Sequence, residues 1–200
     1  MSWSFWLAVA DYLERGGPLM LPIILTSLLL WFLILLQLDL VWRVNRRDLP
    51  LDEALTAVSR RALPANFAGT PLCHLLSHFL PAMAGCWQDD RILLESLVER
   101  ENRRLGRYLP YIFVLASIAP LLGLLGTVLG MISTFDVIAV FGTGNPRALA
   151  NGISEALITT QSGLFVSIPG LFLAGFLRRR VLRLGQRLDE FKAAALQVLS

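Results

Sequence analysis

The chain has 200 residues, of which 55% are hydrophobic and 16% are charged. A soluble globular domain carries about 25% charged residues, so this composition excludes an ordinary cytosolic enzyme. Intrinsic disorder is excluded as well, because it requires low hydrophobicity and a high net charge, whereas the formal net charge here is +3. The composition indicates a membrane protein.

Of the long stretches of sequence without a charged residue, three are strongly apolar. They hold 23, 28 and 22 residues and lie at 16–38, 108–135 and 156–177. Each exceeds the roughly 20 residues that a helix needs to cross about 30 Å of hydrocarbon. We therefore predict an all-α membrane protein with three transmembrane helices. These helices are predicted at about 18–40, 110–135 and 155–177.

Basic residues are concentrated on one side of the predicted spans. Of the 18 basic residues, 16 fall within 43–107 and 178–192, which follow the first span, precede the second and follow the third. Cytoplasmic segments of membrane proteins are enriched in Lys and Arg. The distribution therefore predicts that the amino terminus lies outside and the carboxyl terminus in the cytoplasm. It indicates membrane topology rather than a nucleic-acid-binding surface.

The spans and charges together predict five segments. These are an outer amphipathic segment at 1–17, a first transmembrane helix at 18–42, a cytoplasmic helical segment at 43–107, a transmembrane hairpin at 108–177 and a cytoplasmic carboxyl-terminal helix at 178–200. The aromatic residues of the first segment suit a helix in the outer membrane interface, with a frayed tail as the alternative. No basic region precedes the first apolar run, so we expect no cleavable signal peptide.

The cytoplasmic segment is predicted to form long helices that extend well below the membrane. Asp48 and Pro50 predict the start of a helix over 50–62. A stripe of leucine and valine residues among charged residues predicts another helix over about 89–107. We expect this second helix to continue directly into the second span.

Cys73, His74, His78 and Cys86 are the only thiols and imidazoles in the sequence. His74 and His78 are four residues apart, a helical spacing that can hold a metal ion, but the four residues match no zinc pattern well. We interpret them as reduced cysteines and packing histidines and predict no metal site. No phosphate-binding loop, nucleophile elbow or dinucleotide fingerprint is present, so we expect neither a cofactor nor enzymatic activity.

The second and third spans each carry a stripe of small, weakly polar residues. The stripe residues recur at alternating intervals of three and four, which places them on one helical face. The stripes comprise Ala116, Pro120, Gly123, Thr127, Gly130 and Thr134 in the second span, and Ala156, Thr160, Gly163, Ser167, Gly170 and Ala174 in the third.

Two interpretations of the stripes stay open. Small residues let membrane helices pack closely. We assign this packing role to Gly123, Gly126, Gly130, Gly163, Ser167 and Gly170. We also expect the small faces to need neighbouring subunits for burial, and hence a homo-oligomer. The alternative is that the threonines of the stripes line a path through the membrane.

The position of the turn between the two spans favours such a path. The turn residues at 141–146 lie midway between Thr127 and Thr160. Residues equidistant from the turn of an antiparallel hairpin lie at one height, so we expect the two hydroxyls to face one level of the membrane. Apart from Asp39 and Glu155 near their ends, the spans contain no ionisable side chain. A proton path would therefore need a titratable group from another subunit.

Three runs in this region are more specific than the stripes: APLLGLLGTVLGM at 119–131, GISEALITT at 152–160 and the run at 163–169. Over about 116–175 they resemble the MotA/TolQ/ExbB proton-channel family, in its ExbB-like and TolQ-like branch. The resemblance implies a bacterial inner-membrane protein that forms a pentamer around an ExbD-like single-span partner. The membrane aspartate of that partner carries the proton, and the resulting motion passes to a TonB-like protein.

The resemblance also implies roles for particular residues. Thr127 and Thr160 match the pore-facing threonines of the family, and Glu155 matches its glutamate at the outer end of the third span. Gln161 and Ser162 depart from the family pattern, which commonly has Ala-Ile or Ala-Ala after the second threonine. Glu155 either attracts protons or cations to the mouth or anchors the helix end near water.

A cluster of arginines follows the third span. The cluster consists of Arg178, Arg179, Arg180, Arg183 and Arg187. Basic residues near a membrane surface attract anionic lipids. The cluster is therefore predicted to anchor the chain to cytoplasmic membrane lipids, with a pure topology signal as the alternative.

The predicted function is that of an ExbB-like subunit of a proton-motive-force-driven motor, which energises TonB-dependent transport across the outer membrane. A TolQ-like stator for envelope maintenance and a non-conducting membrane scaffold are the alternatives. A MotA-type stator is less expected, because MotA proteins generally have four spans.

Overall fold

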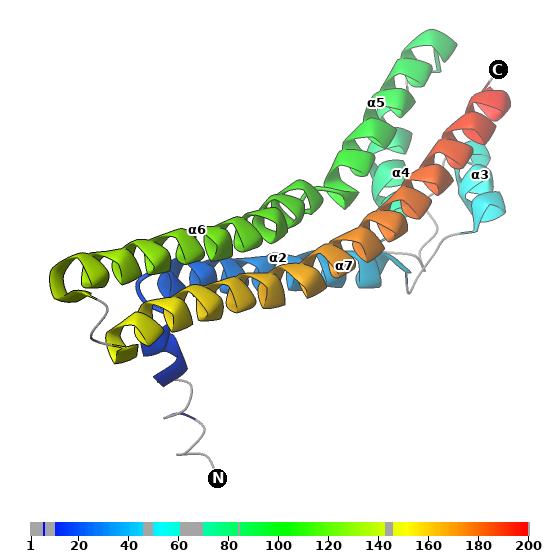
Figure 1. Ribbon diagram of the computed structural model, residues 1–200. Coiled ribbons are helices and arrows are strands. Elements are labelled where there is room, and N and C mark those ends of the chain that lie inside the picture. The colour runs from blue at the N-terminus through cyan, green and yellow to red at the C-terminus, as the bar shows by residue number, and fades with distance from the viewer. Residues whose placement is uncertain are drawn as a thin grey trace. The chain divides into compact units, whose positions relative to one another are not determined.

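The computed structural model describes residues 6, 11–45, 50–60, 70–83, 85–142 and 146–199. The helices are α2 (Met20–Asn45), α3 (Leu51–Arg60), α4 (Pro71–Ala82), α5 (Trp87–Leu105), α6 (Leu109–Phe141) and α7 (Pro146–Leu199) (Figure 1). The described part of the chain contains no β-strand. The predicted all-α fold is therefore confirmed.

Three helical segments are long and apolar enough to cross a membrane. They are Met20–Val44, Trp87–Phe141 and Leu149–Val198. Large apolar side chains, among them Leu21, Leu121, Phe165 and Phe172, are exposed on these helices. Such a surface is suited to lipid or to another membrane helix rather than to water. The prediction of three spans is confirmed, and their orientation across the membrane stays a prediction.

Contacts within the chain divide it into two compact units. The first comprises Met1–Ile34 and Tyr111–Ala174, and the second comprises Leu35–Pro110 and Gly175–Ser200. Helices α2 and α7 contribute to both units. The predicted segment boundary at 177–178 falls inside α7, so the third span and the carboxyl-terminal helix are one continuous helix.

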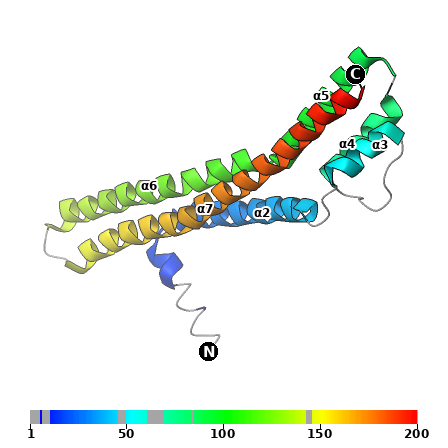
Figure 2. The same cartoon turned by 90° about the vertical axis from the view of Figure 1, so that its right-hand side faces the viewer.

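In the first unit, α6 and α7 form an antiparallel hairpin whose helices run alongside each other (Figures 1 and 2). Their backbones are in direct contact. A Cβ atom placed on Gly163 would lie 2.6 Å from the Ala119 carbonyl oxygen and 3.2 Å from Gly123 Cα. The Ser167 hydroxyl donates a hydrogen bond of 2.8 Å to the Ala116 carbonyl oxygen. Small residues permit this close approach. The van der Waals contacts that result stabilise a helix pair in lipid, where the hydrophobic effect does not drive helices together.

This contact corrects one expectation about the small-residue stripes. We expected their faces to require neighbouring subunits for burial. Instead, Ala116, Gly130, Ala156 and Ser167 are buried within the single chain. The reason is that the two stripes face each other across the hairpin, so that each one covers the other. The stripes by themselves therefore provide no argument for an oligomer.

Helix α2 packs on α7 in the same unit. A Cβ atom on Gly170 would lie 2.7 Å from Leu30 Cδ2, so the glycine leaves room for that leucine. Leu30 is fully buried. The first unit is thus a three-helix arrangement in which α7 contacts both α6 and α2.

The second unit has a conventional hydrophobic core. Fully buried residues from three helices form its centre: Leu75, Leu76, Phe79, Leu94, Leu188 and Phe191. Helix α4 begins with Pro71 at its first turn, and the Thr70 side chain accepts a hydrogen bond of 3.1 Å from the Cys73 amide. This cap satisfies an amide that the helix itself leaves unpaired.

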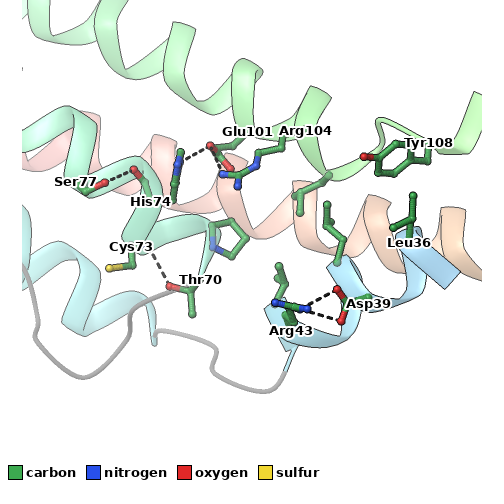
Figure 3. A pocket seen from close by; sticks show the side chains of 14 residues that line it. Leu36, Asp39, Arg43, Thr70, Cys73, His74, Ser77, Glu101, Arg104 and Tyr108 are labelled. Carbon is green, nitrogen blue, oxygen red and sulfur yellow. Dashed lines mark hydrogen bonds and ion pairs between the residues drawn. The ribbon is translucent and has the colours of Figure 1, made fainter. Parts of the chain in front are cut away.

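A cavity of about 600 Å³ lies in the second unit, between α2, α4 and α5 (Figure 3). In its wall, His74 Nδ1 lies 2.7 Å from Glu101 Oε1, which ties α4 to α5. The rings of His74 and His78 contact each other edge to face with centroids 4.8 Å apart. Among the residues that the structure describes, no three His, Cys, Asp or Glu side chains gather in a way that could hold a metal ion.

The junction between α5 and α6 differs from the expectation of one continuous helix. Helix α5 ends at Leu105 and α6 begins at Leu109, with a turn between them. Two sequence features explain the break. Gly106 is a weak helix former, and Pro110 has no amide hydrogen to donate to the Gly106 carbonyl. The Leu105 carbonyl oxygen accepts a hydrogen bond of 2.7 Å from the fully buried Gln37 side chain of α2 instead.

Two other predicted elements are described only in part. The helix predicted over 50–62 is α3, and Asp48, its expected cap, lies outside the described residues. Of the predicted outer segment at 1–17, Trp6 and residues 11–17 are described, and 11–15 form one helical turn. An interfacial position for that segment stays a prediction.

Candidate functional site

The hydroxyl of Thr160 lies at the contact between α6 and α7. It donates a hydrogen bond of 2.9 Å to the Ala156 carbonyl oxygen of its own helix and lies 3.3 Å from the Gly123 carbonyl oxygen of α6. The side chain is half-buried. Its donor is satisfied by backbone oxygens, which leaves the hydroxyl oxygen as an acceptor for an outside donor.

Thr127 has a similar environment on α6. Its half-buried hydroxyl donates a hydrogen bond of 2.6 Å to the Leu124 carbonyl oxygen. In an α-helix the amide of residue 127 bonds the carbonyl of Gly123, the same oxygen that the Thr160 hydroxyl approaches. The two threonines are therefore linked through one carbonyl group.

The relative height of the two threonines differs from the prediction. A Cβ atom on Gly123 would lie 3.1 Å from Thr160 Cα, so Thr160 stands opposite Gly123 rather than opposite Thr127. The expected equal height is wrong by two to four residues, about 3–6 Å along the helix, because the contact between Gly126 and Thr159 places Thr160 level with residue 125. The close glycine contacts set the register of the hairpin, and the midpoint of the turn does not.

The two threonines nevertheless lie on one side of the hairpin. A Cβ atom on Gly126 would overlap the Thr159 side chain, so these two residues face each other. In an antiparallel helix pair, the residue that follows a contact residue is rotated to the same side of the contact in both helices. Thr127 follows Gly126, and Thr160 follows Thr159, so both hydroxyls belong to one face.

That face points away from α2. Ser162 lines a cavity of about 430 Å³ together with Ile23 and Ile24 of α2, so Ser162 faces the α2 side. Thr160 precedes it by two residues, which corresponds to about 200° around the helix. The threonine face is thus the side of the hairpin opposite α2.

Glu155 does not join the two threonines. Its half-buried carboxylate lies against Gly17 of the amino-terminal segment, where a Cβ atom would overlap Glu155 Oε1. Glu155 and Ser162 are seven residues apart and therefore lie on the same face of α7. The structure brings together Thr127 and Thr160 and places Glu155 on the α2 side of the same helix.

Several residues around Glu155 were missed by the sequence analysis. Tyr12 and Ser162 form a hydrogen bond of 3.0 Å, and the turn at Gly16 and Gly17 covers part of α7. The Gly-Gly-Pro sequence at 16–18 is a turn signal, so the turn itself was detectable. Its partner on α7 was not, because nothing local in the sequence links the two segments.

Part of the predicted arginine anchor surrounds a cavity in the second unit. This cavity of about 260 Å³ is lined by Val41 of α2 and by α7 residues that include Arg180, Arg183, Arg187 and one carboxylate, that of Glu190, so that three basic side chains face one acidic side chain. Three of the five predicted anchor residues therefore gather around one hollow. An anionic headgroup is the ligand chemistry that this charge favours, and we propose that the cluster binds membrane lipid.

Changing Arg183 and Arg187 together to Gln is expected to lower the amount of anionic lipid that co-purifies with the protein. Each basic residue near the surface gains about 1 kcal/mol from anionic lipid. Lipid mass spectrometry of the purified protein measures the effect. The matched control changes Arg178 and Arg179 to Gln. This variant loses the same charge, but the two residues do not line the cavity. Lipid content equal to that of the natural chain would contradict the anchor role, and an equal decrease in both variants would assign the binding to surface charge rather than to the cavity.

The helices that carry these residues are similar in sequence to known proteins. Residues 87–190, which include Thr127, Glu155 and Thr160, match the family model described as the MotA/TolQ/ExbB proton channel family. The ExbB-like 1 biopolymer transport protein of Synechocystis sp. is 32% identical over 200 residues, which cover 92% of this chain and 74% of that protein.

Two further relatives carry different names. The biopolymer transport protein ExbB of Aquifex aeolicus is 43% identical over 80 residues, covering 40% of this chain and 54% of the relative. The Tol-Pal system protein TolQ of Pseudomonas aeruginosa is 35% identical over 100 residues, covering 48% of this chain and 43% of the relative. The matched part is thus about half the length of each of these two proteins.

Proposed function

The chain belongs to the MotA/TolQ/ExbB proton channel family, and from this membership we propose that it is an ExbB-like subunit of a motor driven by the proton-motive force. The motor energises TonB-dependent transport across the outer membrane. The three apolar helices make the chain a multi-pass membrane protein, in keeping with a family of the inner membrane. Its role is to conduct protons and convert their energy into motion rather than to catalyse covalent chemistry.

The observation that supports this proposal most directly is the shared face of Thr127 and Thr160. Leu164 and Leu171 follow Thr160 on that side of α7 at helical spacing and are exposed, so the two hydroxyls are set in an apolar surface. In hydrocarbon, polar groups need hydrogen-bonding partners. A carboxyl group on a neighbouring helix is such a partner when it is protonated, because its one O–H hydrogen can be donated to one of the two hydroxyl oxygens.

The spans themselves provide no such carboxyl group at this depth. Asp39 and Glu155 stand near span ends, and no other Asp, Glu, His, Lys or Arg lies within the predicted spans. We propose that an ExbD-like single-span partner supplies a membrane aspartate, around which copies of this chain assemble, five in number. Protonation of that aspartate at the threonine level would change where the partner helix is stable. The resulting motion would pass to a TonB-like protein.

A TolQ-like stator for envelope maintenance is the sibling alternative. It is supported by the 35% identity with a TolQ protein, against 43% with an ExbB protein over a shorter match. A non-conducting scaffold is a second candidate, and it is favoured by the finding that the small-residue stripes bury each other within the chain. The scaffold requires neither a partner aspartate nor the two hydroxyls.

Assembly with the partner provides the direct test. Purified in mild detergent, the protein is expected to be a homo-oligomer of five chains that retains a single-span protein with one aspartate in its span. Native mass spectrometry of protein purified with its genomic neighbours measures both properties. A stable monomer would contradict the motor, and an oligomer that captures no such protein would favour the scaffold.

A further inference from the structure

The turn at Gly16 and Gly17 lies directly against α7. Gly17 has a positive φ of 67°, and a Cβ atom there would overlap Glu155 Oε1 and lie 2.6 Å from Glu155 Cδ. A Cβ atom on Gly16 would lie 3.1 Å from Ile158 Cγ2. The Glu155 carboxylate therefore occupies the space that a Cβ atom at residue 17 would fill, and only glycine leaves that space free.

A second contact joins the same segment to α7. The Tyr12 hydroxyl and Ser162 Oγ are 3.0 Å apart. Ser162 donates its only hydroxyl hydrogen to the Ile158 carbonyl oxygen, at 2.8 Å. Tyr12 is therefore the donor in this pair, because a serine hydroxyl has one hydrogen and two acceptor lone pairs.

The two contacts lie along one face of α7. Glu155, Ile158 and Ser162 are spaced by three and four residues, which places them in a row. The segment that touches this row is held in shape by its own backbone. The Gly16 amide donates to the Tyr12 carbonyl oxygen at 3.2 Å, and the Gly17 amide donates to the Glu14 backbone carbonyl oxygen at 3.3 Å. A short, internally bonded turn thus spans two helical turns of α7.

We propose that this turn positions the Glu155 carboxylate, with Gly17 and Tyr12 as positioning residues. The inference rests on the proposed function, in which Glu155 stands at the predicted outer end of the membrane span that carries Thr160. Whether the carboxylate attracts cations or anchors the helix end, its location depends on the missing Cβ of Gly17. The Tyr12 hydrogen bond to Ser162 holds the turn against α7.

The chain offers a matched control for Gly17. Gly142 also has a positive φ, of 64°, but a Cβ atom there would have no heavy atom within 4 Å. Both Gly17→Ala and Gly142→Ala strain the backbone, because L-residues disfavour this region. Only Gly17→Ala also displaces Glu155, so any difference between the two variants reports on the carboxylate.

The position of Glu155 is measured by its coupling to glycine ethyl ester with a water-soluble carbodiimide in the purified full-length protein, followed by peptide mass spectrometry. Gly17→Ala should raise the labelling rate of Glu155 several-fold over the natural chain, because the displaced carboxylate loses its cover. Gly142→Ala should leave the rate unchanged. Tyr12→Phe, which removes only the hydroxyl, should give a smaller rise and serves if Gly17→Ala does not fold. Equal labelling in all four proteins would overturn the proposal.

The functional consequence is measured as energised transport at equal amounts of assembled protein. Gly17→Ala should lower transport several-fold, and Gly142→Ala should not. Raised labelling with undiminished transport would overturn the positioning role, since the carboxylate would then move without effect. Failure of the proposed function itself would look different, because the natural chain would then show no proton-driven transport while the labelling pattern was unaffected.

Discussion

Changing Thr127 and Thr160 together to Val is expected to lower energised transport by about tenfold or more, corresponding to at least ~1.4 kcal/mol in the limiting step. Valine has nearly the volume of threonine but no hydroxyl, so the substitution removes the acceptors of the shared face. Both hydroxyls donate to backbone carbonyls within their own helices. Their loss should leave the hairpin intact, and oligomer yield should be normal.

Two comparisons sharpen this test. If the two hydroxyls serve one site, the double variant should be little worse than the more severe single variant. Thr159→Val is the matched control, because the buried Thr159 faces Gly126 and its hydroxyl bonds carbonyls of its own helix. We expect this control to transport normally. Undiminished transport in the Thr127 and Thr160 double variant, at normal protein levels, would remove the proton-path role.

Gly163→Ala is expected to destabilise the membrane hairpin by about 3 kcal/mol, the upper part of the range for overpacking a core. The added methyl group would meet the Ala119 carbonyl oxygen at 2.6 Å and the Gly123 backbone at 3.2 Å. Backbone atoms cannot rotate away as a flexible side chain can, so α6 and α7 would have to separate. Thermal denaturation in detergent and the yield of assembled protein measure the effect.

Gly175→Ala is the control for this variant. Gly175 lies on the same helix, but a Cβ atom there would have no heavy atom within 4 Å. Alanine favours the helix over glycine by about 1 kcal/mol, so this variant should be as stable as the natural chain or slightly more so. Equal melting of the two variants would show that α6 and α7 do not approach closely at Gly163.

The three spans and the family were determined by local properties of the sequence. An uncharged stretch such as 108–135 has to cross the membrane or be buried, because its length and apolarity allow little else. The ordered runs around Thr127 and Thr160 indicated a family that the comparison of 87–190 then confirmed. Both inferences rest on residue types and spacings along the chain, which the sequence contains in full.

The register of the hairpin could not be obtained in this way. The midpoint of the turn predicted Thr160 opposite Thr127, but the structure places it opposite Gly123. The register is set by where two backbones can approach, and several small residues in each stripe satisfied that condition equally well. Residues at helical spacing also cover a strip of the helix that is wider than the contact with one neighbouring helix. Spacing alone therefore could not show that Thr159 is buried in that contact while Thr160 lies at its edge.

The surroundings of Glu155 were likewise decided only by the tertiary structure. Residue types predicted a carboxylate near a span end, but its neighbours come from the turn at Gly16 and Gly17, far away along the chain. Whether a position requires glycine depends on which side chain approaches its Cα atom, and that is decided by the packing of distant segments. The sequence by itself therefore determined which segments cross the membrane and which chemistry they carry, while folding decided which residues share a face.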